Sequence, residues 1–487
     1  MHANNSRNCP KYINIRQLVS HPDTKPVVLH ENLNLQPGDR LPQPVIDFIL
    51  NADTIFLGSL FIPDPSIAAK FPSHAGMNSR GGLPGFVRVK PSDGKTVVIP
   101  DYSGNRFLMS LGNIESSHLA SMTIADFVTG NILCITGTAQ VLVGESATSL
   151  MARQACLLTI ETTGYTFIEN ALPFRQAPGT EPERSPYSPK IKYVVDEPEA
   201  LSAASSSGHK AQLASAVQLS SDIAVFGFNV KSKEGTPGLK IRPGQAVVLD
   251  FMDWIGPPQY KHMANDKPES INDDRVRTWT VSSAHEGDDG VTCFEMTMRE
   301  MEGGAVTGAL FNVLRKHPNN IWGKRFQLDG NVVSDVVGVA GDFALGPGSI
   351  NALFVAGGIG VTPFISMLAA ITARRHEAEG NVQLALAARD PEPFLHLIEK
   401  SLEKLSPKLR VSVDLFTRQK VNVGGLLQTN NVTLSVHDGR IPPGYCGRVA
   451  GDKDVFICGP GAFGDAAVED LRAAGVPTSK IHREGFY

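Results

Sequence analysis

The sequence has no closely spaced cysteines. Its six cysteines are scattered over 487 residues, at Cys9, Cys134, Cys156, Cys293, Cys446 and Cys458. Zinc sites and iron–sulfur clusters need cysteines a few residues apart, and disulfide scaffolds occur mostly in short secreted chains. We therefore expect no metal site, and we expect a reducing cytoplasmic compartment.

Long apolar runs and a strong excess of one charge are also missing. No window of about 18 apolar residues occurs, so no membrane-spanning helix and no membrane partner are expected. Residues 1–16 lack the apolar stretch of a signal peptide. The formal net charge is −4 and basic residues are scattered, which disfavours nucleic acid as a partner. With 42% hydrophobic and 19% charged residues, the chain has the balance of a globular protein.

The pattern along the chain indicates a polar arm followed by two β domains. Residues 1–42 are polar and proline-dotted, and we interpret them as the arm. A short helix at 42–51 is followed by short strands at 54–61, 85–89, 96–99, 122–127, 131–136 and 139–143. Turn residues separate these strands, which favours a barrel-like β domain over residues 43–190. Residues 191–213 are expected to be a linker, and residues 214–346 a second, antiparallel β-barrel.

The last region, residues 347–487, alternates strands with helices. Strands are predicted at 352–356, 382–387, 409–415 and 454–458, and helices at 362–375, 393–404 and 464–474. This alternation is typical of a doubly wound parallel sheet. The fold class is therefore multi-domain, α+β and α/β.

A glycine-rich turn opens this last region. Gly357, Gly358 and Gly360 follow a predicted strand directly, and Thr362 and Pro363 begin a predicted helix. A nucleotide-binding turn requires this context, and proline suits the first helical turn because no N–H donor is needed there. The spacing departs from the usual G-x-G-x-x-G, and a glycine-rich turn alone is a weak signal.

Two further patterns suit a flavin nucleotide. Gly303 and Gly304 precede a helix start and expose backbone N–H groups to a phosphate, with the Thr307 hydroxyl close by. In the tetrapeptide 277–280, Arg-Thr-Trp-Thr, the arginine can pair with a phosphate and a later hydroxyl can face a flavin ring edge. An ordinary strand end is an equally good interpretation of that tetrapeptide alone.

Six patterns in order resemble the ferredoxin–NADP reductase superfamily over about residues 212–487. They are Pro243-Gly244-Gln245, Arg277-Thr278-Trp279-Thr280, Gly303-Gly304-x-x-Thr307, the turn at 356–363, Cys458-Gly459-Pro460 and the terminal Glu484-Gly485-Phe486-Tyr487. The resemblance implies FAD in residues 214–346 and NADH or NADPH in residues 347–487. It also implies that hydride passes from the nicotinamide to the flavin.

The resemblance implies a role for each matching residue. Thr280, Cys458 and Glu484 would form the catalytic set, with Thr280 near the reactive flavin edge and the other two beside the nicotinamide. The remaining cofactor-binding residues would hold the flavin and its phosphates, the nicotinamide nucleotide, and a lid over the flavin ring; they are Arg277, Thr278, Trp279, Gly303, Gly304 and Thr307, then Gly357, Gly358, Gly360, Thr362, Arg389, Gly459 and Pro460, and finally Phe486 and Tyr487.

Some points stay open. Cys458 also fits a buried small hydrophobic residue, and Tyr487 also fits a plain chain end. Arg389 suits a 2′-phosphate while Asp390 suits a ribose hydroxyl, so the choice between NADH and NADPH is undecided. The segment 254–274 has no counterpart in the family pattern.

A second cluster lies in the N-terminal region. Arg80 and Arg88 flank a Gly-Gly-Leu-Pro-Gly turn, and Asn105, Arg106 and Ser110 follow another. Arginine, asparagine and serine around glycine turns suit a phosphate, although a solvated loop has the same composition.

Residues 45–180 also resemble the pyridoxamine 5′-phosphate oxidase-related split barrel. The resemblance is carried by Phe-Leu-Gly-Ser at 56–59, the run at 80–89, the run at 104–114 and Thr-Gly-Thr-Ala at 136–139. It implies FMN held by Arg88, Asn105 and Arg106, and a homodimer through this barrel. Ser117 and His118 stand where the family often has asparagine-proline, so contacts to the ring stay open, and some split barrels bind heme, a deazaflavin or nothing.

The leading interpretation is an NAD(P)H-dependent flavin oxidoreductase that relays electrons through FAD and FMN to a small-molecule substrate or O2. One alternative is a single-flavin reductase that serves a separate acceptor protein, with the N-terminal barrel for docking and dimerisation. Another is a non-enzymatic flavin sensor, which would not need Cys458 and Glu484. His74 and His118 are candidate proton donors near the FMN site, but ordinary loop histidines explain them as well.

Overall fold

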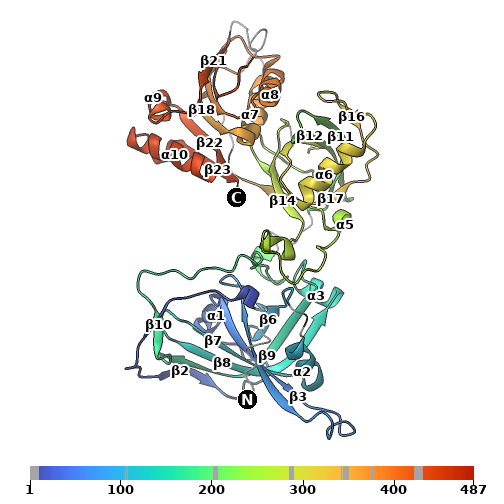
Figure 1. Cartoon of the computed structure of the whole chain (residues 1–487), viewed down its shortest axis with the longest axis vertical. Helices are drawn as coiled ribbons and strands as arrows, with labels where there is room; N and C mark the ends of the chain where they lie inside the picture. The colour runs from blue at the N-terminus through green and yellow to red at the C-terminus, as the bar shows by residue number, and fades with distance from the viewer. Residues whose placement is uncertain are drawn as a thin grey trace. The chain divides into compact units, whose positions relative to one another are not determined.

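The computed structural model describes residues 10–104, 106, 108–200, 207–284, 290–341, 343, 350–374, 378–421 and 431–486. The chain folds into two compact units (Figure 1). The first comprises residues 1–205 together with 257–274, and the second comprises residues 206–256 and 275–487. Residues 257–274 thus belong to the first unit, although strands of the second unit precede and follow them in the sequence.

An antiparallel eight-stranded sheet dominates the first unit. Its order is β4-β3-β7-β8-β9-β6-β5, and β2 adds to β9. The strands are β2 (Val27–Asn32), β3 (Thr54–Phe61), β4 (His74–Gly81), β5 (Arg88–Val89), β6 (Thr96–Pro100), β7 (Leu119–Ala125), β8 (Ile132–Val143) and β9 (Cys156–Glu169). The other elements are the paired strands β1 (Leu18–Ser20) and β10 (Phe174–Gln176), the helices α1 (Gln43–Leu50), α2 (Met109–Ser117) and α3 (Glu145–Leu150), and the 3-10 turns η2 (Pro10–Tyr12) and η3 (Pro268–Asn272).

Local sequence explains the elements that position this unit's core. Val45 and Ile49, four residues apart on α1, are fully buried and pack with Ile55 and Leu57 of β3. The predicted helix at 42–51 and strand at 54–61 are confirmed. The two strands predicted at 131–136 and 139–143 form the single strand β8. The pairing register shifts between Thr136 and Gly137, where Thr163 of β9 is skipped, so the bulge lies on β9 and β8 continues through the glycine.

The predicted arm and linker are more ordered than their composition indicates. Within residues 1–42, β2 pairs with β9, and Leu41 joins the core. Within residues 191–213, Val194 packs in a small apolar cluster and Glu197 forms a buried ion pair. Strand β11 also begins at His209, inside the predicted linker. A few apolar or ion-paired side chains anchor these segments. The polar composition of each segment as a whole gave no indication of these contacts.

The second unit begins with an antiparallel sheet of the order β14-β13-β17-β11-β12-β15, with β16 on β11. The strands are β11 (His209–Gln218), β12 (Ile223–Ser232), β13 (Ala246–Asp250), β14 (Val276–Thr280), β15 (Cys293–Arg299), β16 (Phe326–Gln327) and β17 (Val333–Ala340). The helices are α5 (Met252–Ile255) and α6 (Ala305–Lys316). Helix α6 buries Leu310 and Phe311, and the Phe311 ring meets Phe226 of β12 edge-on, with 5.6 Å between ring centroids.

A six-stranded parallel sheet completes the second unit, in the order β21-β20-β19-β18-β22-β23. The strands are β18 (Ile350–Gly357), β19 (Gly380–Ala387), β20 (Leu409–Thr417), β21 (Val432–Asp438), β22 (Asp454–Pro460) and β23 (Ile481–Phe486). The helices are α7 (Thr362–Ala373), α8 (Glu392–Leu402), α9 (Tyr445–Ala450) and α10 (Gly461–Ala473), with 3-10 turns η4 (Gly358–Val361) and η6 (Thr478–Lys480).

Alternate residues of β18 serve two apolar layers. Phe354 and Ala356 pack with α7 and α8, whereas Leu353 and Val355 pack with α9 and α10. Figure 1 shows the two helix pairs on opposite sides of the sheet. The predicted doubly wound parallel sheet is confirmed, although β21, β23 and α9 were not predicted. In the described ranges, no helix has both the length and the apolar character needed to cross a membrane.

Candidate functional site

The glycine-rich turn joins β18 to α7 through η4. Gly358 has a left-handed φ of +56°, a conformation that side chains other than glycine rarely adopt. Gly360 is packed so tightly that a β-carbon there would lie 2.4 Å from the Cys458 carbonyl oxygen. One glycine therefore forms the turn, and another lets the turn approach the end of β22.

This turn borders a cavity of about 1120 Å³ at the carboxyl ends of the parallel strands. Four of the residues predicted to bind the nicotinamide nucleotide line it, namely Gly357, Gly358, Arg389 and Pro460. Gly360, Thr362 and Gly459 do not line it; Thr362 begins α7 and is buried. Ligands of open parallel sheets bind at this edge, where strand order reverses, and here β18 lies between β19 and β22.

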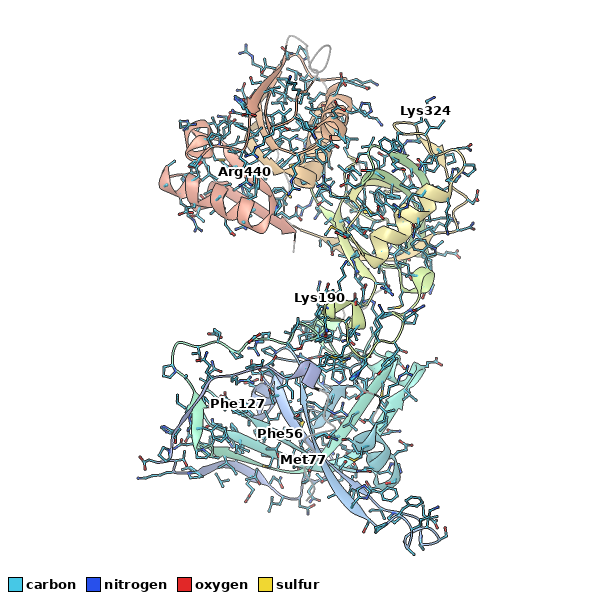
Figure 2. All side chains as sticks on the ribbon, in the orientation of Figure 1. Phe56, Met77, Phe127, Lys190, Lys324 and Arg440 are labelled. Carbon is cyan, nitrogen blue, oxygen red and sulfur yellow. The ribbon has the colours of Figure 1, made fainter. Side chains whose placement is uncertain are left out.

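Three exposed arginines line the cavity from neighbouring strands. Arg389 follows β19 and Arg418 follows β20, and Arg440, which is labelled in Figure 2, comes just after β21. None of the three has a hydrogen bond or ion pair to another side chain among the residues described. Asp390, the alternative to Arg389, does not line the cavity. Arg418 and Arg440 were missed because only the parallel pairing of the strands brings them together.

The predicted flavin-binding tetrapeptide is strand β14. Thr280, at its end, is only 3% exposed, and its Oγ1 has no hydrogen-bond partner among the described residues. Trp279 packs against the apolar cluster of this antiparallel sheet, where its ring meets Phe251 edge-on with 5.9 Å between centroids. Arg277 shares the face of Trp279, as alternate strand residues do, and Thr278 is exposed.

The second glycine pattern forms the start of α6. Gly303 has a left-handed φ of +61°, and Gly304 precedes the helix. The Thr307 hydroxyl accepts a hydrogen bond from the backbone N–H of Met301 at 3.1 Å, which closes the turn. The first backbone N–H groups of this helix are the kind of donors that bind phosphate.

The other two predicted catalytic residues are neighbours across two parallel strands. Cys458 of β22 pairs in register with Glu484 of β23. Cys458 is fully buried, and burial, together with the Glu484 charge, raises the pKa of its thiol, so it stays protonated at neutral pH. Burial raises the pKa of Glu484 from 4.5 to about 7, and its Oε2 has no hydrogen-bond partner in the described structure.

A series of side-chain and backbone contacts connects Glu484 with the end of β14. A β-carbon on Gly341 would lie 3.5 Å from Glu484 Oε1, so the two residues are adjacent. The carbonyl oxygen of Gly341 accepts a hydrogen bond from Gln245 Nε2 at 2.8 Å. The carbonyl oxygen of Gln245 accepts one from the backbone N–H of Val281 at 3.0 Å, next to Thr280. Cys458 and Glu484 are thus adjacent, and two intermediate residues, Gly341 and Gln245, link Glu484 to the residue that follows Thr280.

The residues of this region fit a flavin. Buried polar atoms almost always have partners, so the unpartnered Thr280 Oγ1 and Glu484 Oε2 are each available to a polar group bound beside them. The polar edge of an isoalloxazine ring offers such donors and acceptors. Tyr487 and the side chain of Phe486, predicted to cover the ring, lie outside the described residues.

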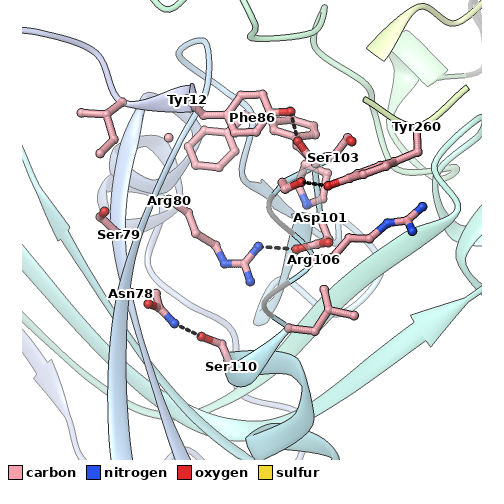
Figure 3. A pocket seen from close by; sticks show the side chains of 16 residues that line it. Tyr12, Asn78, Ser79, Arg80, Phe86, Asp101, Ser103, Arg106, Ser110 and Tyr260 are labelled. Atoms are coloured by element: carbon pink, nitrogen blue, oxygen red, sulfur yellow. Dashed lines mark hydrogen bonds and ion pairs between the residues drawn. The ribbon is translucent and has the colours of Figure 1, made fainter. Parts of the chain in front are cut away.

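A second pocket, of about 290 Å³, lies in the first unit (Figure 3). Of the predicted FMN-binding residues, Arg80, Arg106 and Ser110 line it. Arg80 forms an ion pair with Asp101, and Ser110 accepts a hydrogen bond from Asn78. Four aromatic residues complete the wall: Tyr12, Phe86, Tyr102 and Tyr260. Asn105 lies outside the described residues.

Arg88, which was expected to share a phosphate with Arg106, does not line this pocket. It is 8% exposed, and its guanidinium forms a bidentate pair with the carboxylate of Glu197. A buried guanidinium needs such a partner, so Arg88 is held away from the pocket. His74 and His118, the candidate proton donors, do not line the pocket either.

Comparison with a family model finds a match within the second unit. Residues 354–469 match the oxidoreductase NAD-binding domain family. The chain is 34% identical over 136 residues to the ferredoxin reductase component of a 3-ketosteroid-9-alpha-monooxygenase from Mycolicibacterium smegmatis, over 28% of this chain and 33% of that protein. It is 30% identical over 148 residues to flavohemoprotein A from Dictyostelium discoideum, over 30% of this chain and 33% of that protein. The chain thus spans about a third of each relative's length.

Solved structures give a weaker likeness. The flavohem-like FAD/NAD-binding domain of a nitric oxide dioxygenase from Vibrio cholerae covers 57% of this chain and 98% of its own, at 18% identity and a TM-score of 0.37. A cytochrome P450 reductase from Amycolatopsis covers 80% of this chain and 96% of its own, at 15% identity and a TM-score of 0.36. The sequence match is therefore the stronger finding: residues 354–469 match the oxidoreductase NAD-binding domain family, and part of the chain is similar to a ferredoxin reductase component.

Proposed function

We propose that the protein is an NAD(P)H-dependent flavoprotein oxidoreductase. The observation that carries this proposal is the cavity beside the glycine turn, which lies almost wholly within the residues that match the NAD-binding family. Thr280, Cys458 and Glu484 support it, because they converge from the barrel and from the nucleotide sheet. A flavin bound at the end of β14 would accept hydride from the reduced nicotinamide and pass electrons on.

Each of the three residues has a distinct role in this proposal. Thr280 offers an unpartnered hydroxyl that orients a ring edge. The neutral Cys458 thiol packs the hydride path without placing a charge in it. Glu484, with a pKa of about 7, is protonated below that pH and can donate a hydrogen bond in that state.

The cavity favours NADPH over NADH. NADPH differs by a 2′-phosphate, a dianion that arginines bind through charge-assisted hydrogen bonds. Arg389, Arg418 and Arg440 line one cavity with no ion-pair partner among the described residues, whereas the fourth lining arginine, Arg299, pairs with Asp222 at 3.3 Å. Glu469 and Asp470 also line the cavity but only partly offset these charges.

Coenzyme kinetics test this preference. A charged hydrogen bond contributes about 1.5–3 kcal/mol, so Arg418→Ala or Arg440→Ala should lower kcat/KM for NADPH roughly ten- to hundredfold. The value for NADH should change much less. Arg410→Ala is the matched control, because Arg410 is an exposed arginine near the amino end of β20, at the opposite sheet edge. Equal losses with both coenzymes would contradict the assignment.

The finer proposal is a two-flavin relay. Electrons would pass from NAD(P)H through FAD to FMN in the pocket of the first unit, and then to a small-molecule substrate or O2. Arg80 and Arg106 at that pocket support an anionic ligand there. A homodimer formed through the first unit and a cytoplasmic location belong to the same proposal.

A second candidate is a single-flavin reductase that donates electrons to a separate acceptor protein. The relative named as a ferredoxin reductase component of a monooxygenase favours it. Flavin stoichiometry separates the two. Denaturing the purified protein and measuring FAD and FMN should release one of each per chain for the relay, and FAD alone for the single-flavin reductase. Release of no flavin at all would contradict both.

A further inference from the structure

Residues 257–274 lie between α5 and β14 and interrupt the strands of the antiparallel sheet of the second unit, where we propose that the flavin binds. Both ends of this segment are pinned, since Arg275 Nε donates a hydrogen bond to the Gly256 carbonyl oxygen at 3.0 Å. The backbone N–H of Phe251 also donates to the Arg275 carbonyl oxygen at 3.2 Å. The segment is therefore a closed loop of 18 residues whose body folds with the first unit. Loops of this length in compact proteins are usually functional.

Specific contacts anchor the loop in the first unit. Ile271 is buried in an apolar cluster with Tyr12 and Tyr187. Asn272 Nδ2 donates to the Tyr12 hydroxyl at 2.9 Å and to the Tyr187 carbonyl oxygen at 3.1 Å. Tyr12 in turn lines the pocket and donates its own hydroxyl to the Ser103 carbonyl oxygen at 2.7 Å. The loop thus supports one wall of the pocket.

Tyr260 carries the loop into the pocket itself. Its ring lies 3.6 Å from the Arg106 guanidinium carbon, a close cation–π stack, and Figure 3 shows the two side chains together at the pocket edge. Its hydroxyl donates a hydrogen bond to the Gly104 carbonyl oxygen at 2.7 Å. One tyrosine therefore holds both the side chain of Arg106 and the backbone turn that precedes it.

Arg106 needs such support. Its φ is +60°, in the left-handed region that is unfavourable for a residue other than glycine. Its side chain is exposed, and within the described structure the stack on Tyr260 is the interaction that holds it. Without the tyrosine, a long exposed guanidinium would sample many rotamers, and ordering it for a ligand would cost binding free energy.

We propose that Tyr260, supplied by a loop of the reductase barrel, is a positioning residue that holds Arg106 for the phosphate of a ligand in the first unit. The inference rests on the proposed FMN site and deepens it. It assigns Tyr260 to the phosphate and not to the ring of the ligand, because its ring face is already occupied by Arg106. It also gives the otherwise unexplained insertion a role, because the loop ties a binding site of one unit to the barrel of the other through the chain.

Comparison of FMN with riboflavin tests the assignment, because riboflavin has the same ring without the phosphate. Binding of each is titrated on the full chain after bound FMN has been dialysed away. Arg106→Ala should weaken FMN roughly ten- to hundredfold, and Tyr260→Ala should weaken it about two- to fivefold. Neither variant should change the affinity for riboflavin. Tyr260→Phe keeps the ring stack and should bind FMN nearly as the wild type does.

The matched control is Tyr193→Ala, because Tyr193 makes the same kind of stack, at 4.9 Å, with Arg88 in the same unit. It should alter neither affinity. Equal weakening of FMN and riboflavin by Tyr260→Ala would overturn the inference, as would no weakening at all. If the wild type binds neither FMN nor riboflavin, both the two-flavin relay and this inference are wrong. The proposed reductase function is tested separately, by FAD content and by NADPH-driven reduction of ferricyanide.

Discussion

The Cys458 side chain is completely buried, and it lies beside Glu484, which is partly buried. Its raised thiol pKa means that it cannot act as a thiolate near neutral pH, so any role in hydride transfer must come from packing. We predict that Cys458→Ala leaves FAD bound but slows its reduction by NADPH roughly ten- to hundredfold, since small misplacement of donor and acceptor has effects of this order. Stopped-flow bleaching of the flavin measures it.

Cys446→Ala is the control for that experiment. Cys446 is also a buried thiol with a raised pKa, but it belongs to α9 and to the opposite apolar layer, and it lines the coenzyme cavity away from Glu484. At saturating NADPH it should reduce the flavin at the wild-type rate. If Cys458→Ala does the same, Cys458 is simply a buried hydrophobic residue, the alternative that its sequence context left open.

The raised pKa of Glu484 predicts that both activity and stability depend on pH. Its pKa rises from 4.5 to about 7, so the folded protein holds this proton more tightly than the unfolded chain. The associated stability is full below pH 4.5 and is lost as the pH rises through about 7. Glu484→Gln should remove an inflection near pH 7 from the rate of flavin reduction. Its melting temperature should also fall less than that of the wild type between about pH 5 and about pH 8. Identical profiles would exclude Glu484 as the titrating group.

At the scale of elements, the turn from β18 to α7 contains two glycines with different roles: Gly360 packs against β22, and Gly358 faces the cavity. A β-carbon at Gly360 would collide with the backbone of β22, whereas one at Gly358 would meet open space in the cavity. We predict that Gly360→Ala destabilises the protein by about 1–3 kcal/mol, the usual cost of overpacking. Gly358→Ala should cost about 1–2 kcal/mol for its left-handed φ and should also raise the KM for NADPH. Thermal unfolding and steady-state kinetics measure both. A harmless Gly360→Ala would contradict the close approach.

The nucleotide sheet could be predicted from sequence because its elements are locally determined. Strand 352–356, the glycine turn and the helix at 362 follow one another with no gap, and the hydrophobic runs are long enough to fix the type of element. The helix α2 escaped notice because its sequence, Met-Ser-Leu-Gly-Asn-Ile-Glu-Ser-Ser, has glycine and serine at helical positions. Strand β21 escaped because its exposed positions are mostly polar and it lies at the sheet edge.

The site was predictable only where its residues are close together in the sequence. Gly357, Gly358 and Arg389 could be named in advance, whereas Arg418 and Arg440 are scattered after separate strands and meet only through parallel pairing. Arg88 pairs with Glu197, which is 109 residues away in the sequence, and this pairing holds its side chain away from the pocket that the local glycine-rich pattern indicated. Nothing in the sequence around Tyr260 predicted its role, because a polar insertion in the sequence of one unit does not indicate that it folds with the other unit.

At the scale of the whole molecule, the apolar clusters of the described residues divide cleanly between the two units. Three clusters draw only on the first unit, including the one that contains Ile271 of the loop 257–274. Three others draw only on the second unit. A unit with its own core can in principle fold by itself. The second unit contains every element of the proposed reductase, from the FAD barrel to the NADPH cavity.

We therefore predict that the second unit is an autonomous reductase once the loop is removed. Residues 206–256 joined by a short glycine turn to residues 275–487 should fold, because Gly256 and Arg275 are already within hydrogen-bonding distance. Closing a loop with a shorter connection also costs less chain entropy. The product should contain FAD but no FMN, and it should reduce ferricyanide with NADPH at close to the rate of the full chain. Flavin analysis, circular dichroism and that assay measure it. A soluble product that lacks FAD would show that the second unit needs the first unit to hold its flavin. The prediction that the second unit is an autonomous reductase would then be wrong.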